Sequence, residues 1–232
     1  MIDIRPFESL GAANHGWLDA RHHFSFASYH DRNRMGWGAI RVWNDDTIAA
    51  QTGFDPHPHN DMEIITFVRT GAISHKDSMG NEGRTGAGDV QVMSAGSGVV
   101  HAEYNREAEA TTLFQIWVIP DERGGAPHWG QREFPRGDRS GKWVTLASGS
   151  PDADDALPIR ADARVMAATL LAGSVIDQTV NPSRHQYLVA PVGRLRINGI
   201  EAQPRDGIAV TGETTIRIEA IDDLEIVMVD AR

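Results

Sequence analysis

Short runs of apolar or alternating residues recur along this chain of 232 residues, and turn-forming Gly, Pro, Asn or Asp closes each of them. They are rich in Val, Ile, Thr and aromatic residues, and few keep a helical period for three turns. Such runs predict short β-strands. Many short strands with frequent turns are typical of β-sandwiches and barrels, so we predict an all-β fold. The clearest runs are 39–43, 62–68, 89–93, 112–119, 142–147, 164–172, 195–199 and 223–229.

A stretch dense in Gly, Pro and charged residues, between Asp121 and Gly141, divides the chain. This composition is typical of a connection rather than of a strand. We therefore expect one domain over residues 1–122 and a second over 142–232, joined by a linker over 123–141. The chain is long enough for this, since domains usually have about 100–200 residues.

The two units share a pattern that indicates a degenerate duplication. Aligning Gly71 with Gly193 and Gly96 with Gly212 sets two strand–turn–strand stretches side by side. The predicted architecture is a pair of antiparallel β-sandwich or barrel units in one chain.

Charge and composition exclude several classes of function. The chain has 22 Lys and Arg against 32 Asp and Glu, a net charge of −10, and no basic block that could bind a nucleic acid backbone directly. It has no Cys, so disulfides and thiolate metal sites are excluded. Charged residues near the N-terminus argue against a signal peptide, and no apolar run is long enough to span a membrane. We expect a cytoplasmic protein without membrane contact.

Two pairs of residues at strand spacing predict a metal site. His57 and His59 are two residues apart, so in a strand their side chains face the same side, and the same holds for His101 and Glu103. A single pair of this kind is more often a solvated loop or a core histidine. The occurrence of both pairs, together with the Gly-rich turns GRTGAGD (83–89) and SAGSG (94–98), favours three imidazoles and a carboxylate around one metal ion. Glu63, also at even spacing from His59, is a further candidate ligand.

The segments around these residues resemble the two cupin motifs. Gly53, His57, His59, Glu63 and Gly71 resemble the first motif, and the second runs from Gly88 to Asn105, with Ser94 where many cupins have Pro. More specifically, the chain resembles the pirin family, in its bacterial quercetinase-like branch. The matching segments are HHFSFASYHD (22–31), MGWGAIRVWNDD (35–46), HPHNDMEIITFV (57–68), GAISHKDSMGN (71–81), GDVQVMSAGSGVVHAEYN (88–105) and LFQIWVIP (113–120).

This resemblance implies a bicupin fold with His57, His59, His101 and Glu103 as metal ligands. Glu63 would then lie outside the ligand set. The resemblance also implies a C-terminal cupin-like domain without metal.

The alignment of the two units leads to the same expectation. It places Thr179 and Asn181 against His57 and His59, and Arg217 and Glu219 against His101 and Glu103. We expect this unit to pack against the first and to shield its site. Three other histidines, His75, His128 and His185, lack a partner at ligand spacing.

Three imidazoles and a carboxylate suit one divalent transition metal, with Fe(II) first and Ni, Co, Cu, Mn or Zn as alternatives. The resemblance implies quercetin 2,3-dioxygenase activity. Glu103 would be the catalytic base that takes the 3-hydroxyl proton of a flavonol, which reacts with O₂ and loses carbon monoxide. One alternative is a metal- or redox-sensing regulator that binds a protein partner. Another is a cupin isomerase or decarboxylase.

Overall fold

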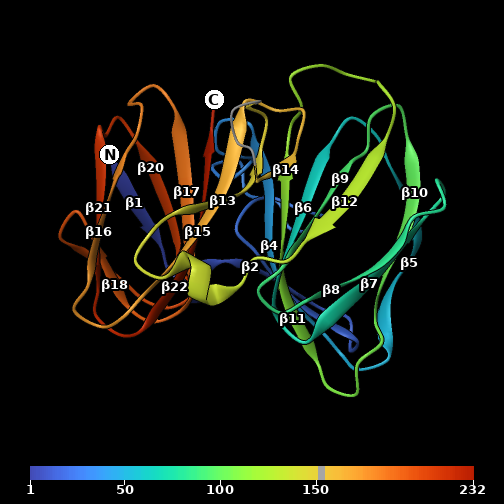
Figure 1. The fold of residues 1–232 in the computed structure, drawn as a ribbon, viewed down its shortest axis with the longest axis horizontal. Helices are drawn as coiled ribbons and strands as arrows, with labels where there is room; N and C mark the ends of the chain where they lie inside the picture. The colour runs from blue at the N-terminus through green and yellow to red at the C-terminus, as the bar shows by residue number, and fades with distance from the viewer. Residues whose placement is uncertain (151–154) are drawn as a thin grey trace.

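The computed structural model describes residues 1–150 and 155–232, which form two β units side by side (Figure 1). In this part of the chain each unit consists of a seven-stranded sheet and a four-stranded sheet. Two short 3-10 segments, η1 (Phe7–Ser9) and η2 (Arg136–Arg139), are its helical elements. No helix in the described ranges is long and apolar enough to cross a membrane. The prediction of an all-β chain with two antiparallel sandwich units is confirmed.

The first unit is built from strands between Gly11 and Arg132. Its large sheet has the order β12-β9-β6-β11-β4-β3-β2, and its small sheet has the order β5-β10-β7-β8. The strands are β2 (Gly11–Asn14), β3 (Leu18–His22), β4 (Ile40–Ile48), β5 (Thr52–His59), β6 (Glu63–Thr70), β7 (Ala72–Asp77), β8 (Glu82–Gly86), β9 (Val90–Ser94), β10 (Val99–Asn105), β11 (Thr111–Val118) and β12 (His128–Arg132).

The second unit repeats this plan. Its large sheet has the order β1-β20-β17-β22-β15-β13-β14, and its small sheet has the order β16-β21-β18-β19. The strands are β1 (Ile2–Arg5), β13 (Val144–Ser148), β14 (Leu157–Pro158), β15 (Ala163–Leu170), β16 (Val175–Thr179), β17 (His185–Val192), β18 (Leu195–Ile197), β19 (Ile200–Ala202), β20 (Gly207–Thr211), β21 (Thr215–Ala220) and β22 (Leu224–Ala231).

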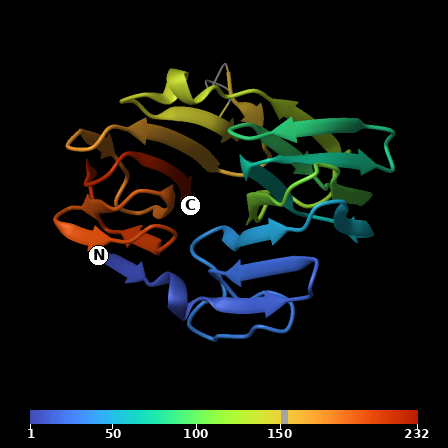
Figure 2. The ribbon, with the colours of Figure 1, turned by 90° about the horizontal axis from the view of Figure 1, so that it is seen from below.

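Two strands lie in sheets that the expected domain limits do not suggest. β1, from the first residues of the chain, pairs with β20 of the second unit, as Figure 2 shows beside the N-terminus. β12, within the expected linker, pairs with β9 of the first unit. The limits 1–122, 123–141 and 142–232 therefore stay a prediction for the domains, and β1 and β12 belong to sheets outside the ranges in which they lie.

The strand order supports the duplication. β9, β6, β11 and β4 of the first large sheet correspond in order to β20, β17, β22 and β15 of the second, and β5-β10-β7-β8 corresponds to β16-β21-β18-β19. Gly71 and Gly193 each follow the equivalent strand with positive φ angles of 72° and 84°. Such angles favour Gly over residues with a Cβ atom.

The residue-by-residue alignment of the small sheets is wrong. Arg217, which it placed against His101, lies on the surface, where it pairs with exposed Asp177 at 3.1 Å. The neighbouring side chains of Ile216 and Ile218 fill the interior instead, together with Ile176. A shift of one residue turns every side chain of a strand to the opposite face, and the sequence pattern could not exclude it. Aliphatic side chains therefore occupy the interior of the second small sheet.

The two units pack through the faces of their large sheets. One apolar cluster contains Trp43 and Phe114 of the first unit together with Tyr187 and Val229 of the second. Alternate residues of β4 and β11 thus face the other unit, and the residues between them face the interior of the first unit.

An ion-pair network ties the units together at Asp45, which is 1% exposed. Its carboxylate accepts hydrogen bonds from Arg69 of its own unit and, at 2.7 Å, from Nε of Arg205 in the second unit.

Replacing Asp45 by Asn should lower the free energy of unfolding by about 3 kcal/mol, because the buried Arg69 guanidinium would lose its counter-charge. Urea denaturation measures this. Asp177→Asn is the control, because its pair with Arg217 is exposed and should contribute less than about 1 kcal/mol. Equal losses in the two variants would contradict the structural role of Asp45.

Candidate metal centre

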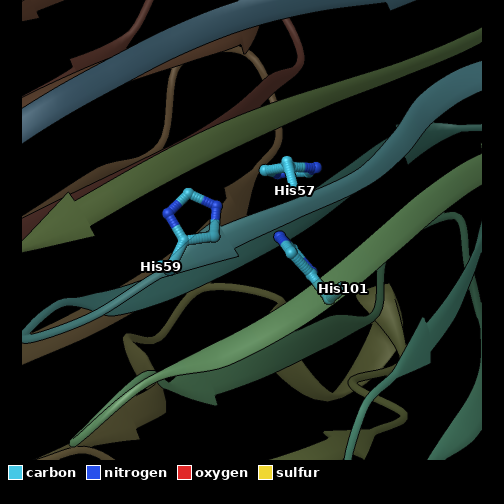
Figure 3. Close-up of side chains that lie close together, drawn as sticks. All are labelled: His57, His59 and His101. Atoms are coloured by element: carbon cyan, nitrogen blue, oxygen red, sulfur yellow. The ribbon is translucent and has the colours of Figure 1, made fainter.

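Antiparallel pairing of β5 with β10 brings three histidines together. His57 lies directly opposite His101, and His59 lies opposite Val99, two residues further along the paired strands. Figure 3 shows the three imidazoles converging from these two strands. The ring centroids are 4.5 Å apart for His57 and His101, 4.8 Å for His57 and His59, and 5.0 Å for His59 and His101.

The three rings can offer nitrogen lone pairs to one ion. One ligand nitrogen of each lies within 4.8 Å of the others. The Nδ1–H of His57 donates to the carbonyl oxygen of Asp55 at 2.8 Å, because a carbonyl can only accept, and this leaves Nε2 of His57 free. Nε2 of His101 is buried without a hydrogen-bond partner among the described residues. An unpartnered buried nitrogen facing two other imidazoles fits a divalent transition metal.

Burial keeps two of these rings neutral. The pKa of His59 is lowered to about 4 and that of His101 to about 3, in both cases first by desolvation and then by neighbouring histidines. Metal ions bind the neutral form of imidazole, so at neutral pH these two nitrogens are ready to coordinate.

His75, which the sequence pattern left without a partner, lies behind His101. Its Nδ1 is 3.5 Å from Nδ1 of His101, and its Nε2 donates to Asp77 at 3.1 Å. Burial by itself would raise the pKa of Asp77, but hydrogen bonds from Asn81, His75 and two backbone N–H groups lower it. The contacts are satisfied when His101 donates its Nδ1–H to His75, which leaves Nε2 of His101 toward the other two imidazoles. Only the pairing of β7 with β10 reveals this arrangement.

Glu103 lies beside the three histidines but does not join their group. It is 2% exposed, and a carboxylate oxygen lies within 4.8 Å of a ring nitrogen of His101 and of His75 instead. A bulge between His101 and Glu103 interrupts the pairing with β5. Three side chains donate to Glu103: Gln91 at 2.6 Å, Gln115 at 2.7 Å and Thr66 at 3.3 Å.

These donors belong to a row of polar side chains that crosses the large sheet. Its members lie opposite one another on β3, β4, β11, β6 and β9, and we call them the polar row: His22, Asn44, Gln115, Thr66 and Gln91. At the end of the row far from Gln91, a hydrogen bond of 2.9 Å joins His22 and Asn44. Sequence reasoning missed the row because its members come from five separate strands.

The histidines open onto a cavity of about 300 Å³. Its lining residues come from positions 13–117, all in the first unit. The ring of Trp117 packs edge-on against that of His59, with 4.9 Å between the ring centroids. The ring centroids of Phe54 and His57 are 6.1 Å apart. The expectation that the second unit shields the site is wrong, because that unit packs against the other face of the large sheet.

Glu63 lies away from the cavity. β5 ends at His59 and β6 begins at Glu63, so the even spacing between them does not continue through one strand. Ile64 lines the cavity, and Glu63, next to it in the strand, is buried and accepts a hydrogen bond from Ser94 at 2.6 Å. Desolvation raises the pKa of Glu63, and the nearby charge of Arg160 opposes this.

His101→Ala should strip bound metal, because His101 supplies the most buried of the three nitrogens. We expect the unaltered protein to hold about one divalent ion per chain. Metal analysis of untagged protein after dialysis measures the loss. His128→Ala is the control, because His128 lies exposed on β12. Equal metal content in both variants would contradict the site.

His75→Ala should keep the site but weaken it. Removing a group that orients a ligating histidine typically costs about 10–100-fold in metal affinity. Competition with a chelator of known affinity measures the change. An affinity unchanged from that of the unaltered protein would show that His75 does not orient His101.

Comparisons with known proteins cover the whole chain. The family model described as pirin matches residues 4–118, and the one described as quercetinase C-terminal cupin domain matches residues 145–231. A pirin-like protein of Caulobacter vibrioides is 61% identical over 231 residues, with 100% of both chains covered. The quercetin 2,3-dioxygenase of Escherichia coli K12 is 43% identical, with 99% of this chain and 98% of the relative covered.

A solved structure of high similarity is the bacterial pirin YhhW of Escherichia coli in complex with nickel(II). It has a TM-score of 0.94 at 40% identity and covers 100% of this chain and 99% of its own. The bicupin architecture implied by the sequence motifs is thus confirmed, and the histidine cluster and this relative support a single divalent metal. The sequence match over both units and the shared fold show that this chain belongs to the pirin family.

Proposed function

We propose that this protein is a metal-dependent dioxygenase that opens flavonols such as quercetin with O₂ and releases carbon monoxide. The observation that carries the proposal is the convergence of three imidazole side chains on an apolar cavity, with one buried carboxylate beside them. The name of the Escherichia coli relative, a quercetin 2,3-dioxygenase at 43% identity, supports the same activity.

In this proposal His57, His59 and His101 hold the metal, and Glu103 completes the set. We propose Fe(II) as the metal, because histidine and carboxylate ligands suit this ion. The same ligands also suit Ni(II), which the Escherichia coli pirin structure contains. When bound, the ion would supply a Lewis acid that stabilises negative charge on a substrate oxygen.

Glu103 is proposed to act as the base. A carboxylate has about four lone-pair positions, and three described donors occupy part of them. The position that these donors leave can serve the ion or take the proton of the flavonol 3-hydroxyl, but not both at once. Because Gln91 and Gln115 hold the two oxygens from the polar row, the carboxylate is fixed in place before substrate enters.

The aromatic walls of the cavity suit a flat ring system. Trp117 packs against His59 and Phe54 lies beside His57, and Ile64 and Leu18 add apolar surface. Apolar walls exclude water around the reacting oxygen, and this strengthens the interaction of its charge with nearby polar groups.

Glu103→Gln tests the proposal on metal-reloaded protein. The amide keeps the shape of the side chain, so the fold should persist. Without the base, O₂ uptake and carbon monoxide release with quercetin should fall by about 10²–10⁴-fold. Flavonol should then bind anaerobically without the red-shifted absorbance of its anion, and turnover should recover partly at high pH, where solvent removes the proton.

Glu63→Gln is the matched control, because Glu63 lies on the opposite face of the sheet. It should leave the spectral shift in place. The proposed role of Glu103 is refuted if Glu63→Gln abolishes the shift and Glu103→Gln does not. If the unaltered, metal-loaded protein consumes no O₂ with any flavonol, the proposed activity itself is refuted.

A further inference from the structure

A second carboxyl group, Asp46 on β4, lines the same cavity and has no part in the proposed reaction. Its side chain is 2% exposed, and it contributes to the cavity wall together with Glu103 and the histidines. Its Oδ1 atom is buried with no hydrogen-bond partner among the residues that the structure describes. Buried polar groups are nearly always paired, so an unpaired one in a cavity wall points to a partner that enters from the cavity.

The residues around Asp46 make this more specific. It lies in the row next to the polar row, where its in-register neighbours are Ala20 on β3 and Leu113 on β11. Phe54 and Leu18 line the same cavity and belong to the same apolar cluster as Ala20 and Leu113. Asp46 is thus a single carboxyl set among apolar side chains.

The adjacent Asp45 shows what a structural carboxylate looks like in this strand. Asp45 faces the other unit and is held by Arg69 and Arg205. Asp46 faces the cavity and forms no ion pair among the described residues. Desolvation first, and then the charges of Asp45 and Glu103, raise the pKa of Asp46 well above its ordinary value. Burial of Asp46 therefore destabilises the fold, and no ion pair among the described residues offsets this.

We propose that Asp46 determines substrate specificity by hydrogen-bonding a ring hydroxyl of the flavonol, at the apolar end of the cavity away from Trp117. The inference rests on the proposed function and adds the class of flavonol: those with hydroxyls on the rings as well as at position 3. A carboxyl group pairs with a hydroxyl in either protonation state, since its oxygens accept in both and it also donates when protonated.

Selectivity follows from the desolvation of Asp46. A flavonol without ring hydroxyls would fill the cavity but leave the carboxyl unpaired, whereas a hydroxylated one satisfies it. Sites built to hydrogen-bond a substrate hydroxyl strongly reject analogues that lack it.

The test compares two probes, quercetin and 3-hydroxyflavone, which lacks the ring hydroxyls. Dissociation constants are measured under nitrogen by quenching of tryptophan fluorescence, on both metal-loaded and metal-free protein. The unaltered protein should bind quercetin more tightly than 3-hydroxyflavone. Asp46→Leu should reduce the ratio of the dissociation constant for 3-hydroxyflavone to that for quercetin by about ten-fold or more. Asp46→Asn, which keeps a polar group of the same shape, should retain part of the preference and serves as a second variant if Asp46→Leu does not fold.

Thermal unfolding separates this role from a structural one. Asp46→Leu should leave the melting temperature unchanged or raise it, because it removes an unpaired buried carboxyl. Asp45→Asn is the matched control, which should lower the melting temperature and leave the ratio unchanged.

Two outcomes overturn the role of Asp46 alone: an unchanged ratio in the Asp46 variants of a protein that still turns over quercetin, or a fall in melting temperature as large as that of Asp45→Asn. Binding of neither probe by the unaltered protein overturns the proposed function, and this inference with it.

Discussion

The burial of Glu103 is the constraint on which the site depends. A carboxylate inside a β unit is costly unless donors satisfy it, and here Gln91, Gln115 and Thr66 do so. These donors exist as a set only because β11, β6 and β9 pair in one register, which places the three side chains in one row. The large sheet therefore acts as the support for the small sheet that carries the histidines. A shift of a single residue in any of these strands would turn donors away from Glu103 and put apolar side chains in their place.

The same alternation connects the site to the contact between the two units. In β4, Asn44 and Asp46 face the cavity, while Trp43 and Asp45 face the second unit. The second unit thus stabilises the wall of the site from behind without contributing to its lining. The opposite face of the same strand therefore stabilises the fold, while Asp46 has no ion pair within residues 1–150 and 155–232. Functional sites commonly carry such a cost, and other parts of the structure offset it.

The second unit shows the same architecture with a different interior. Its strands keep the order of the first, but Ile176, Ile216 and Ile218 fill the space that the first unit gives to polar ligands. An interior of aliphatic residues packs without any need for hydrogen-bond donors, so this unit requires no counterpart of the polar row. The pairing of Arg217 with Asp177 on its surface shows that the charged residues of the small sheet face solvent. The first unit thus lines its cavity with polar groups, and the second packs its interior with aliphatic side chains.

The sequence by itself determined the all-β class, the clearest strands, the two-unit plan and the placement of His57 and His59, because each of these depends on local alternation or on turn residues. It also led to the right family, because the motifs around the histidines are long and specific. Only the tertiary structure decided that His75 lies behind His101, that Glu63 faces away from the cavity and that Oδ1 of Asp46 lies in its wall without a partner among the described residues. These facts depend on the register between strands that are far apart in the chain. Register is set by the packing of whole sheets, so a periodic pattern of two within one strand cannot specify which face meets which neighbour.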